Sequence, residues 1–165
     1  MRFVSKTHLM LTNYNNLTDF SKVYIYTSSR KFYPNEMEEL EDKIKYFLVQ
    51  WTKYTTSYKI EYQRFIAVFL EENIEVSTQM LDTLSNFILS LEDDYKITLL
   101  DKVNVCFKQG EHVQYQEMKR FRELIKNKSV SKKTIVFNNF IQTKAEFETA
   151  WEIPILESWL SHLIK

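Results

Sequence analysis

Residues 134–159 read T-I-V-F-N-N-F-I-Q-T-K-A-E-F-E-T-A-W-E-I-P-I-L-E-S-W. This segment holds a predicted strand over 134–141, an Asn pair, one of the two prolines and two of the three tryptophans. Apolar bulk and polar side chains therefore lie close together in the chain. We expect this segment to supply part of the hydrophobic core and to be the best candidate for a binding site.

Apolar runs and helical spacing predict regular elements in the rest of the chain. Strands are expected at 22–27, 58–70 and 134–141, and a hairpin is expected over 103–115 with Gly110 in its turn. Helices are expected at 34–51, from 78 to about 94, at 116–127, at 144–151 and at 155–164. Pro34 marks the start of the first helix, and Ser77 or Thr78 can cap the second.

This order of elements predicts the fold class. Helices that cover a sheet of partly and fully apolar strands are typical of an α/β or α+β fold. We expect a single domain over residues 21–165, with one mixed β-sheet of about five strands packed by four to five helices. Residues 1–20 show no sustained period, so we expect them to form an irregular N-terminal arm.

Composition excludes several classes of protein. The chain has 165 residues, 44% of them hydrophobic, which is enough for one substantial core. Its 22 basic and 22 acidic side chains cancel, so no overall field would steer the molecule towards nucleic acid or a membrane surface. The single cysteine, Cys106, excludes an internal disulfide framework and favours a cytoplasmic location. No apolar window is long enough to predict a membrane-spanning helix.

Glycine is nearly absent, and this absence bears on nucleotide chemistry. Gly110 is the only glycine, whereas an average usage of about 7% would give roughly a dozen. Neither the G-x-x-x-x-G-K-[ST] loop nor the G-x-G-x-x-G loop can therefore exist, because both need several glycines to bring the backbone close to phosphates. The sequence therefore excludes a P-loop ATPase.

No set of residues indicates catalysis. The three histidines, His8, His112 and His162, have no second histidine or carboxylate at helical spacing, so we name no metal ligand and no cofactor. Cys106 lies in an alternating strand, where a free cysteine is usually a small buried apolar residue. We name no catalytic residue, and the sequence favours a protein that is not an enzyme.

Polar residues at the ends of strands are candidates for ligand binding. In open α/β sheets, ligands bind beyond the carboxyl ends of the strands. The candidate ligand-binding residues are Arg30, Arg64, Asn138, Asn139, Ser158 and Trp159. Each also has a structural explanation: an arginine can pair with a nearby acid such as Glu36, an Asn pair often caps or turns the chain, and tryptophans pack in cores.

A second candidate is the basic segment from Lys119 to Lys133. Seven cations face only Glu123 in this interval, and such a segment can contact the phosphates of RNA. The candidate nucleic-acid contacts are Lys119, Arg120, Arg122, Lys126, Lys132 and Lys133. A basic helix face is also a common solvated surface, and the neutral total charge counts against a dedicated nucleic-acid protein.

Several segments resemble one family of proteins. They are V-Y-I-Y-T-S-S-R-K-F (23–32), Y-Q-R-F-I (62–66), N-V-C-F-K (104–108), V-F-N-N-F-I-Q-T-K (136–144) and W-E-I-P-I-L-E-S-W-L (151–160). In their order and spacing they are similar to a family of roughly 160-residue proteins of the Bacteroidetes and Flavobacteria that is commonly filed as "ABC transporter ATPase". That label implies nucleotide hydrolysis, which the missing P-loop contradicts. The matching residues are Arg30, Phe32, Arg64, Asn138, Thr143, Trp151, Pro154, Ser158 and Trp159, and the resemblance assigns no role to any of them.

Three hypotheses on function follow. The first is a cytoplasmic, non-catalytic binding or interaction module, whose partner the sequence does not identify and which can be a protein. The second is a small-molecule-binding protein or enzyme with a pocket near Arg30, Asn138 and Trp159. The third is contact with RNA or phosphate through Lys119–Lys133.

Overall fold

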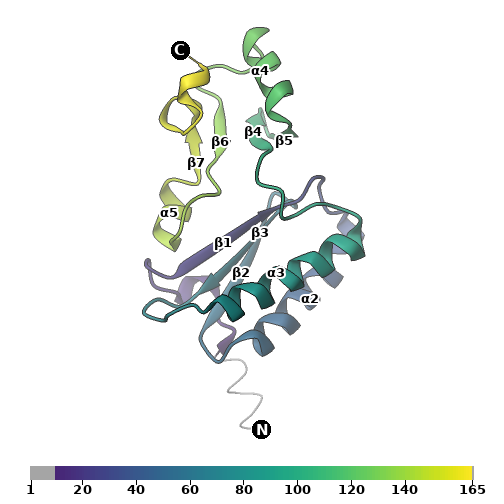
Figure 1. The fold of residues 1–165 in the computed structure, drawn as a ribbon, viewed down its shortest axis with the longest axis vertical. Helices are drawn as coiled ribbons and strands as arrows, with labels where there is room; N and C mark the ends of the chain where they lie inside the picture. The colour runs from purple at the N-terminus through teal and green to yellow at the C-terminus, as the bar shows by residue number, and fades with distance from the viewer. Residues whose placement is uncertain (1–9, 165) are drawn as a thin grey trace. The chain divides into compact units, whose positions relative to one another are not determined.

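The computed structural model describes residues 10–164, and the chain divides into two compact units (Figure 1). Unit 1 comprises the chain up to Leu100 together with Gln142–Ala145, and unit 2 comprises Asp101–Ile141 and the chain from Glu146 onward. The described residues form four α-helices and two antiparallel sheets, of three and four strands, so the fold is α+β. The predicted class is confirmed at this level.

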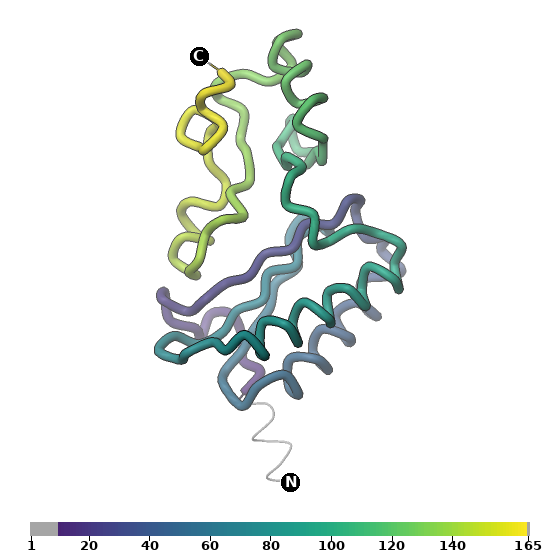
Figure 2. Tube along the Cα trace, viewed as in Figure 1, coloured from purple at the N-terminus to yellow at the C-terminus, as the bar shows by residue number. Residues whose placement is uncertain are grey.

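Unit 1 is a three-stranded antiparallel sheet with two helices on one face. The strands β1 (Lys22–Thr27), β2 (Thr56–Glu61) and β3 (Phe65–Leu70) lie in the order β1-β3-β2. The helices α2 (Pro34–Trp51) and α3 (Thr78–Tyr95) run side by side over this sheet (Figure 2). The core between these two layers follows from helical spacing, because each helix buries one stripe. The stripes are Leu40, Ile44 and Leu48 on α2, and Leu84, Ile88 and Leu91 on α3.

Strand β3 is buried along its whole length, as its unbroken apolar sequence F-I-A-V-F-L predicts. Ile66 and Val68 belong to the core cluster that the two helices cover. Phe69 points to the opposite face, where the ring of Tyr14 packs edge-on against it with 5.0 Å between centroids. Tyr14 belongs to a short 3-10 helix, η1 (Tyr14–Asn16).

An irregular N-terminal arm was expected over residues 1–20. Residues 1–9 of this arm lie outside the described residues. Its described part contacts unit 1. Leu11 forms a bridge with Thr56, and the backbone N–H of Thr12 donates to the Thr56 carbonyl at 2.9 Å. The buried ammonium of Lys144 donates to the Leu17 carbonyl at 2.8 Å, which helps to join residues 142–145 to unit 1.

Unit 2 is a four-stranded antiparallel sheet with its own core. Its strands are β4 (Val105–Gln109), β5 (His112–Gln116), β6 (Ile135–Phe137) and β7 (Glu152–Pro154), in the order β5-β4-β6-β7. Its helix α4 (Met118–Lys126) packs on this sheet through Phe121 and Leu124. A further helix, α5 (Lys144–Thr149), starts in unit 1 and ends in unit 2. Two 3-10 turns follow, η2 (Ile155–Glu157) and η3 (Ser161–Leu163).

The predictions of two helix starts and of one hairpin, which rest on local signals, are confirmed. α2 begins at Pro34, and the Glu36 carboxylate accepts a hydrogen bond from the Tyr33 N–H at 2.7 Å. α3 begins after Ser77, whose hydroxyl accepts from the Met80 N–H at 3.1 Å. The hairpin β4–β5 turns at Gly110, which has a φ of 62°.

The prediction of one mixed sheet of about five strands is wrong. All pairs of named strands are antiparallel, and they form two separate sheets. The expected long strand over 58–70 is in fact β2, a turn and β3. Tyr62 and Gln63 make this turn with φ values of 55° and 53°, a conformation that residues with a Cβ rarely adopt, so the sequence carries no turn signal there.

The predicted closing helix over 155–164 is also wrong. Ser158 interrupts it, because its hydroxyl donates to the Ile155 carbonyl and accepts from the Leu160 N–H. The backbone hydrogen bonds around Ser158 join residues three apart in the chain, as in the bond from the Leu163 N–H to the Leu160 carbonyl. Two 3-10 turns therefore form in place of an α-helix. Glu152–Pro154, which lies between the two expected helices at 144–151 and 155–164, pairs with β6 as the edge strand β7.

The residue that ends α3 allows a test of how much a left-handed backbone conformation costs in stability. Lys96 ends α3 in the left-handed conformation with φ 55°, and its side chain is exposed. Glycine lacks the Cβ that makes this conformation costly, so Lys96→Gly should raise the free energy of unfolding by about 1 kcal/mol. Chemical denaturation measures this change. Lys96→Ala, which keeps the Cβ, is the control and should give no gain; equal stability of the two variants would contradict the expectation.

Candidate functional site

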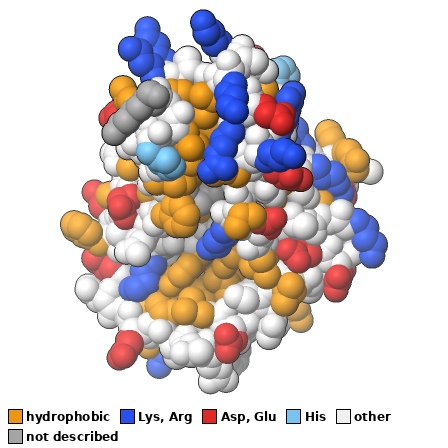
Figure 3. Space-filling view, turned by 45° about the horizontal axis from the view of Figure 1, so that its top comes forward, with side chains coloured by type: hydrophobic (Ala, Val, Ile, Leu, Met, Phe, Trp, Pro, Cys, Tyr) orange, Lys and Arg blue, Asp and Glu red, His pale blue; other side chains and the backbone are white. Residues whose placement is uncertain are grey.

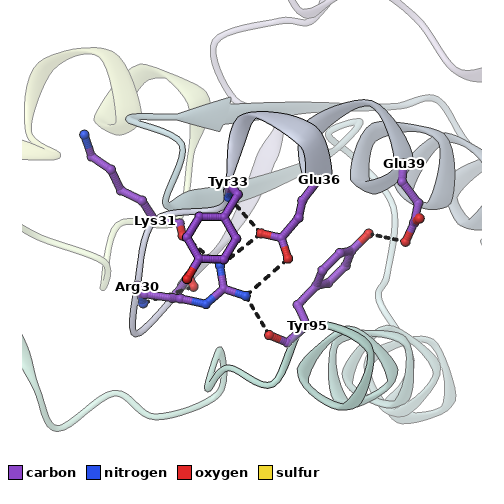
Figure 4. A network of polar contacts seen from close by, with 7 residues as sticks. Arg30, Lys31, Tyr33, Glu36, Glu39 and Tyr95 are labelled. Atoms are coloured by element: carbon purple, nitrogen blue, oxygen red, sulfur yellow. Dashed lines mark hydrogen bonds and ion pairs between the residues drawn. The ribbon is translucent and has the colours of Figure 1, made fainter.

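Arg30 follows β1 and joins three elements of unit 1 (Figure 4). Its Nη1 donates to the Glu36 carboxylate and to the Lys31 carbonyl, both at 2.9 Å. Its Nη2 donates to the second Glu36 oxygen at 3.2 Å and to the Tyr95 carbonyl at 2.7 Å. The Tyr33 ring packs against the guanidinium, whose carbon lies 4.3 Å from the ring centroid. Arg30 therefore ties the end of β1 to the start of α2 and the end of α3.

The charge state of this pair follows from its geometry. The hydrogen bonds from Arg30 hold the pKa of the Glu36 carboxyl below its usual range, against the opposing effect of burial, and the Tyr33 N–H lowers it further. The same hydrogen bonds raise the pKa of Arg30. A permanently charged, bidentate ion pair of this kind holds structure and does not exchange protons near neutral pH.

A second charged group lies beside the first and links α2 to α3. The Lys43 ammonium is 2.8 Å from Glu39 and 3.0 Å from Asp94, and it packs over the Tyr95 ring at 4.7 Å. The Tyr95 hydroxyl donates to Glu39 at 3.0 Å (Figure 4). The hydrogen bond from Lys43 lowers the pKa of Glu39, and the bond to Glu39 raises the pKa of Lys43.

An open cavity of about 490 Å³ adjoins this group. It is lined by Asn35, Glu38, Glu39, Asp42, Lys43 and Tyr46. All six residues come from α2, so the cavity is a surface hollow along one helix. A general acid or base needs a pKa close to the working pH, and the ion pair with Lys43 moves the pKa of Glu39 in the wrong direction.

Arg64 lies close to Arg30, because both contact Ser28. The Arg64 side chain is buried, and its Nη1 donates to the Ser28 carbonyl at 3.2 Å. The Ser28 N–H donates to the Arg64 carbonyl at 2.9 Å, and the Ser28 hydroxyl accepts from the Arg30 N–H at 3.3 Å. The turn between β2 and β3 is thereby fixed against the end of β1.

The other four ligand-binding candidates lie in unit 2, and two of them hold Trp151. The Asn139 side chain accepts from the indole N–H of Trp151 at 2.8 Å, and the Asn138 N–H donates to the Trp151 carbonyl at 2.7 Å. Trp151 is buried and packs against Phe137 and Phe147, with centroids 4.9 and 4.8 Å away. The Asn139 side chain thus positions a core tryptophan, whereas the Asn138 side chain accepts a hydrogen bond from the Phe140 N–H at 3.1 Å.

Ser158 and Trp159 differ in their roles. Ser158 is buried and shapes the turn between η2 and η3. Trp159 is 42% exposed and meets Phe140, which is 62% exposed, in an edge-to-face contact with centroids 5.5 Å apart. Sequence reasoning missed Phe140, because an aromatic residue after an apolar strand gives no sign that it faces solvent.

The basic segment forms an exposed, charged surface on unit 2. α4 buries Phe121 and Leu124, so its cations point outward. Lys119, Arg122 and Lys126 recur at i, i+3 and i+7 and therefore share one side of the helix. The exposed cations of the helix and the following loop are Lys119, Arg120, Arg122, Lys126, Lys128, Lys132 and Lys133. Figure 3 shows lysine and arginine side chains gathered over the α4 end of unit 2.

These cations are poorly neutralised. Arg120 pairs with Glu123, at 3.2 Å between Nη1 and the carboxylate, and both side chains are about half exposed. Within residues 10–164, none of the other six forms an ion pair with an acidic side chain. The basic surface is therefore a group of predicted contacts that are exposed and, apart from Arg120, lack an acidic partner among the described residues.

The described residues offer neither a metal-binding cluster nor a membrane-spanning helix. Among them, no three His, Cys, Asp or Glu side chains lie close enough to hold a metal ion. No helix in residues 10–164 combines the length and apolar composition that crossing a bilayer requires. Cys106 is buried in β4.

Comparison with known proteins adds no assignment. No family model, no curated protein and no solved structure matches this chain. The function is therefore argued from the geometry of the two units alone.

The Arg30–Glu36 pair gives a test by mutation. Arg30→Ala should lower the free energy of unfolding by about 1–2 kcal/mol, because it leaves Glu36 without its partner in a partly solvated place. Lys31→Ala is the matched control, because the Lys31 side chain is exposed and points away from the network (Figure 4). If Arg30→Ala were as stable as Lys31→Ala, the Arg30–Glu36 pair would contribute nothing to the free energy of unfolding.

The difference in free energy of unfolding between wild type and Arg30→Ala should depend on pH, because the pKa of Glu36 determines when the ion pair is charged. The folded-state pKa lies below the ordinary value of 4.5, so the stabilisation is present above that value. It is lost as the pH falls through the folded-state pKa. The gap between wild type and Arg30→Ala should therefore narrow on acidification, as measured by urea denaturation at a series of pH values; a gap that widens would contradict the assignment.

Proposed function

We propose that the protein is a non-catalytic binding module that contacts single-stranded RNA through the exposed cations of Lys119–Lys133. The observation that carries this proposal is the set of six exposed cations with no acidic partner in the described chain. Phosphate groups at the surface neutralise such cations and release bound counterions, which is the main source of affinity in non-specific nucleic-acid binding.

The positions of the polar candidates support a protein without catalysis. Arg30 is engaged by Glu36 and by two backbone carbonyls, the Asn138 side chain accepts from the Phe140 N–H, and the Asn139 side chain holds Trp151. A small-molecule pocket near Arg30, Asn138 and Trp159 draws less support, because the first two are already used to hold the fold. A nucleophile with an adjacent base, which acyl or phosphoryl chemistry would need, is not among the predicted site residues.

One feature favours single-stranded RNA over a duplex. Phe140 and Trp159 expose aromatic faces in the same unit as the cations, and unpaired bases stack on such rings. The segment from Lys119 to Lys133 contains no glycine that would let its backbone approach a phosphate closely, so contact through long, flexible side chains is the mode that it allows. Recognition of this kind tolerates many sequences.

Charge reversal tests the proposal. The triple variant Lys119→Glu, Arg122→Glu, Lys126→Glu should raise the Kd for a fluorescently labelled oligouridine by about tenfold or more, measured by anisotropy. The dependence of log K on log salt should also become shallower, by about 0.7 for each phosphate that the variant no longer neutralises.

The matched control reverses three exposed cations elsewhere, Lys53, Lys96 and Lys102, and so carries the same change in net charge. It should keep most of the affinity. Equal loss in both variants would show that only net charge matters, and absent or salt-insensitive binding of the wild-type protein would reject RNA as the ligand.

A further inference from the structure

Strand β2 has one side paired and one side open. The Glu71 N–H donates to the Thr55 carbonyl at 2.9 Å, and in the antiparallel register this places the main-chain groups of Ser57, Lys59 and Glu61 towards β3. The main-chain groups of the alternate residues Thr56, Tyr58 and Ile60 therefore point away from the sheet. β2 is the edge strand in the order β1-β3-β2.

The described chain covers only the start of this edge. Leu11 and Thr12 pair with Thr56. Beyond them, the N–H and carbonyl groups of Tyr58 and Ile60 have no hydrogen-bond partner among residues 10–164. An open cavity of about 470 Å³ lies along this edge, and its lining includes Tyr14, Glu41, Lys45, Tyr58, Lys59 and Ile60. An open edge of this kind is a template for a further strand.

The side chains on this edge are self-complementary in charge. Lys59 and Glu61 lie on the same face, with 3.8 Å between ammonium and carboxylate, and each is a little more than one-third exposed. Suppose that β2 of a second copy pairs antiparallel with β2 so that the two Ile60 residues lie opposite each other. Lys59 of each copy then lies opposite Glu61 of the other copy. A shift of two residues would instead place Lys59 opposite Lys59.

We infer that β2 is the interface between two copies of this chain, which pair edge to edge in the register centred on Ile60. The two three-stranded sheets then form one continuous six-stranded antiparallel sheet. The opposite charges select a second copy over an unrelated peptide, because a two-fold axis makes each copy supply the lysine of one ion pair and the glutamate of the other. Glu41 and Lys45, one charge of each sign, line the same cavity on the helix side.

The interface is independent of RNA binding, and cross-linking tests its register. In that register the Cα atoms of the two Ile60 residues are about 5.5 Å apart, within the range of a disulfide. The full-length Ile60→Cys variant should therefore form a disulfide-linked dimer under mild oxidation, read on a non-reducing gel. Lys59→Cys is the control, because its Cα atoms would lie roughly 8 Å apart, beyond that range. Equal cross-linking of both variants would overturn the register.

Sedimentation of the unmodified protein from micromolar to submillimolar concentration tests the association itself. It should show a monomer–dimer equilibrium, and a monomer throughout would overturn the inference. Lys59→Glu and Glu61→Lys should each raise the dimer Kd by about tenfold, because every ion pair becomes a repulsion. The double variant Lys59→Glu, Glu61→Lys restores opposite charges and should return the Kd to within about threefold of wild type. A double variant as weak as the single variants would rule out the pairing of Lys59 with Glu61.

Discussion

The backbone of this protein must make its turns almost without glycine, and this constraint governs its turns and underlies the mode of RNA contact that we propose. In the described chain, five residues with side chains adopt positive φ where glycine would be easier: Tyr62, Gln63, Asn73, Lys96 and Lys128. Such residues keep a Cβ at every close approach, so the main chain cannot wrap a phosphate as a glycine-rich loop does. The proposed contact with RNA phosphates therefore rests on side chains.

Most of the polar side chains that the sequence offers as ligand-binding candidates make hydrogen bonds within one of the two units. Arg30 fastens α2 and α3 to the end of β1, and Asn139 of unit 2 fixes Trp151. The two surfaces that we propose for partners, the basic side of α4 and the edge of β2, lie in different units.

Sequence reasoning succeeded where the signal is local. Helix α2, the Ser77 cap and the hairpin at Gly110 each follow from a few neighbouring residues, and the pairing of Arg30 with Glu36 follows from a short separation in the chain. It failed where the decisive feature lacks a residue-type signature, as in the turn at Tyr62–Gln63. Sequence reasoning also did not predict which strands share a sheet, because strand order depends on contacts between segments far apart in sequence. For the site, the exposed cations of α4 were predictable from helical spacing, whereas the exposure of Phe140 was not.

The central claim is that ligands meet this protein through the side chains of the basic surface and not through the polar groups that hold the fold. Chemical-shift mapping of the full-length protein, titrated with a single-stranded oligouridine, tests it most directly. The account predicts shifts concentrated in the backbone amides of residues 117–134, with those around Arg30 and Trp151 unchanged. Shifts concentrated at Arg30, Asn138 or Asn139 instead, or no shifts at all, would contradict it.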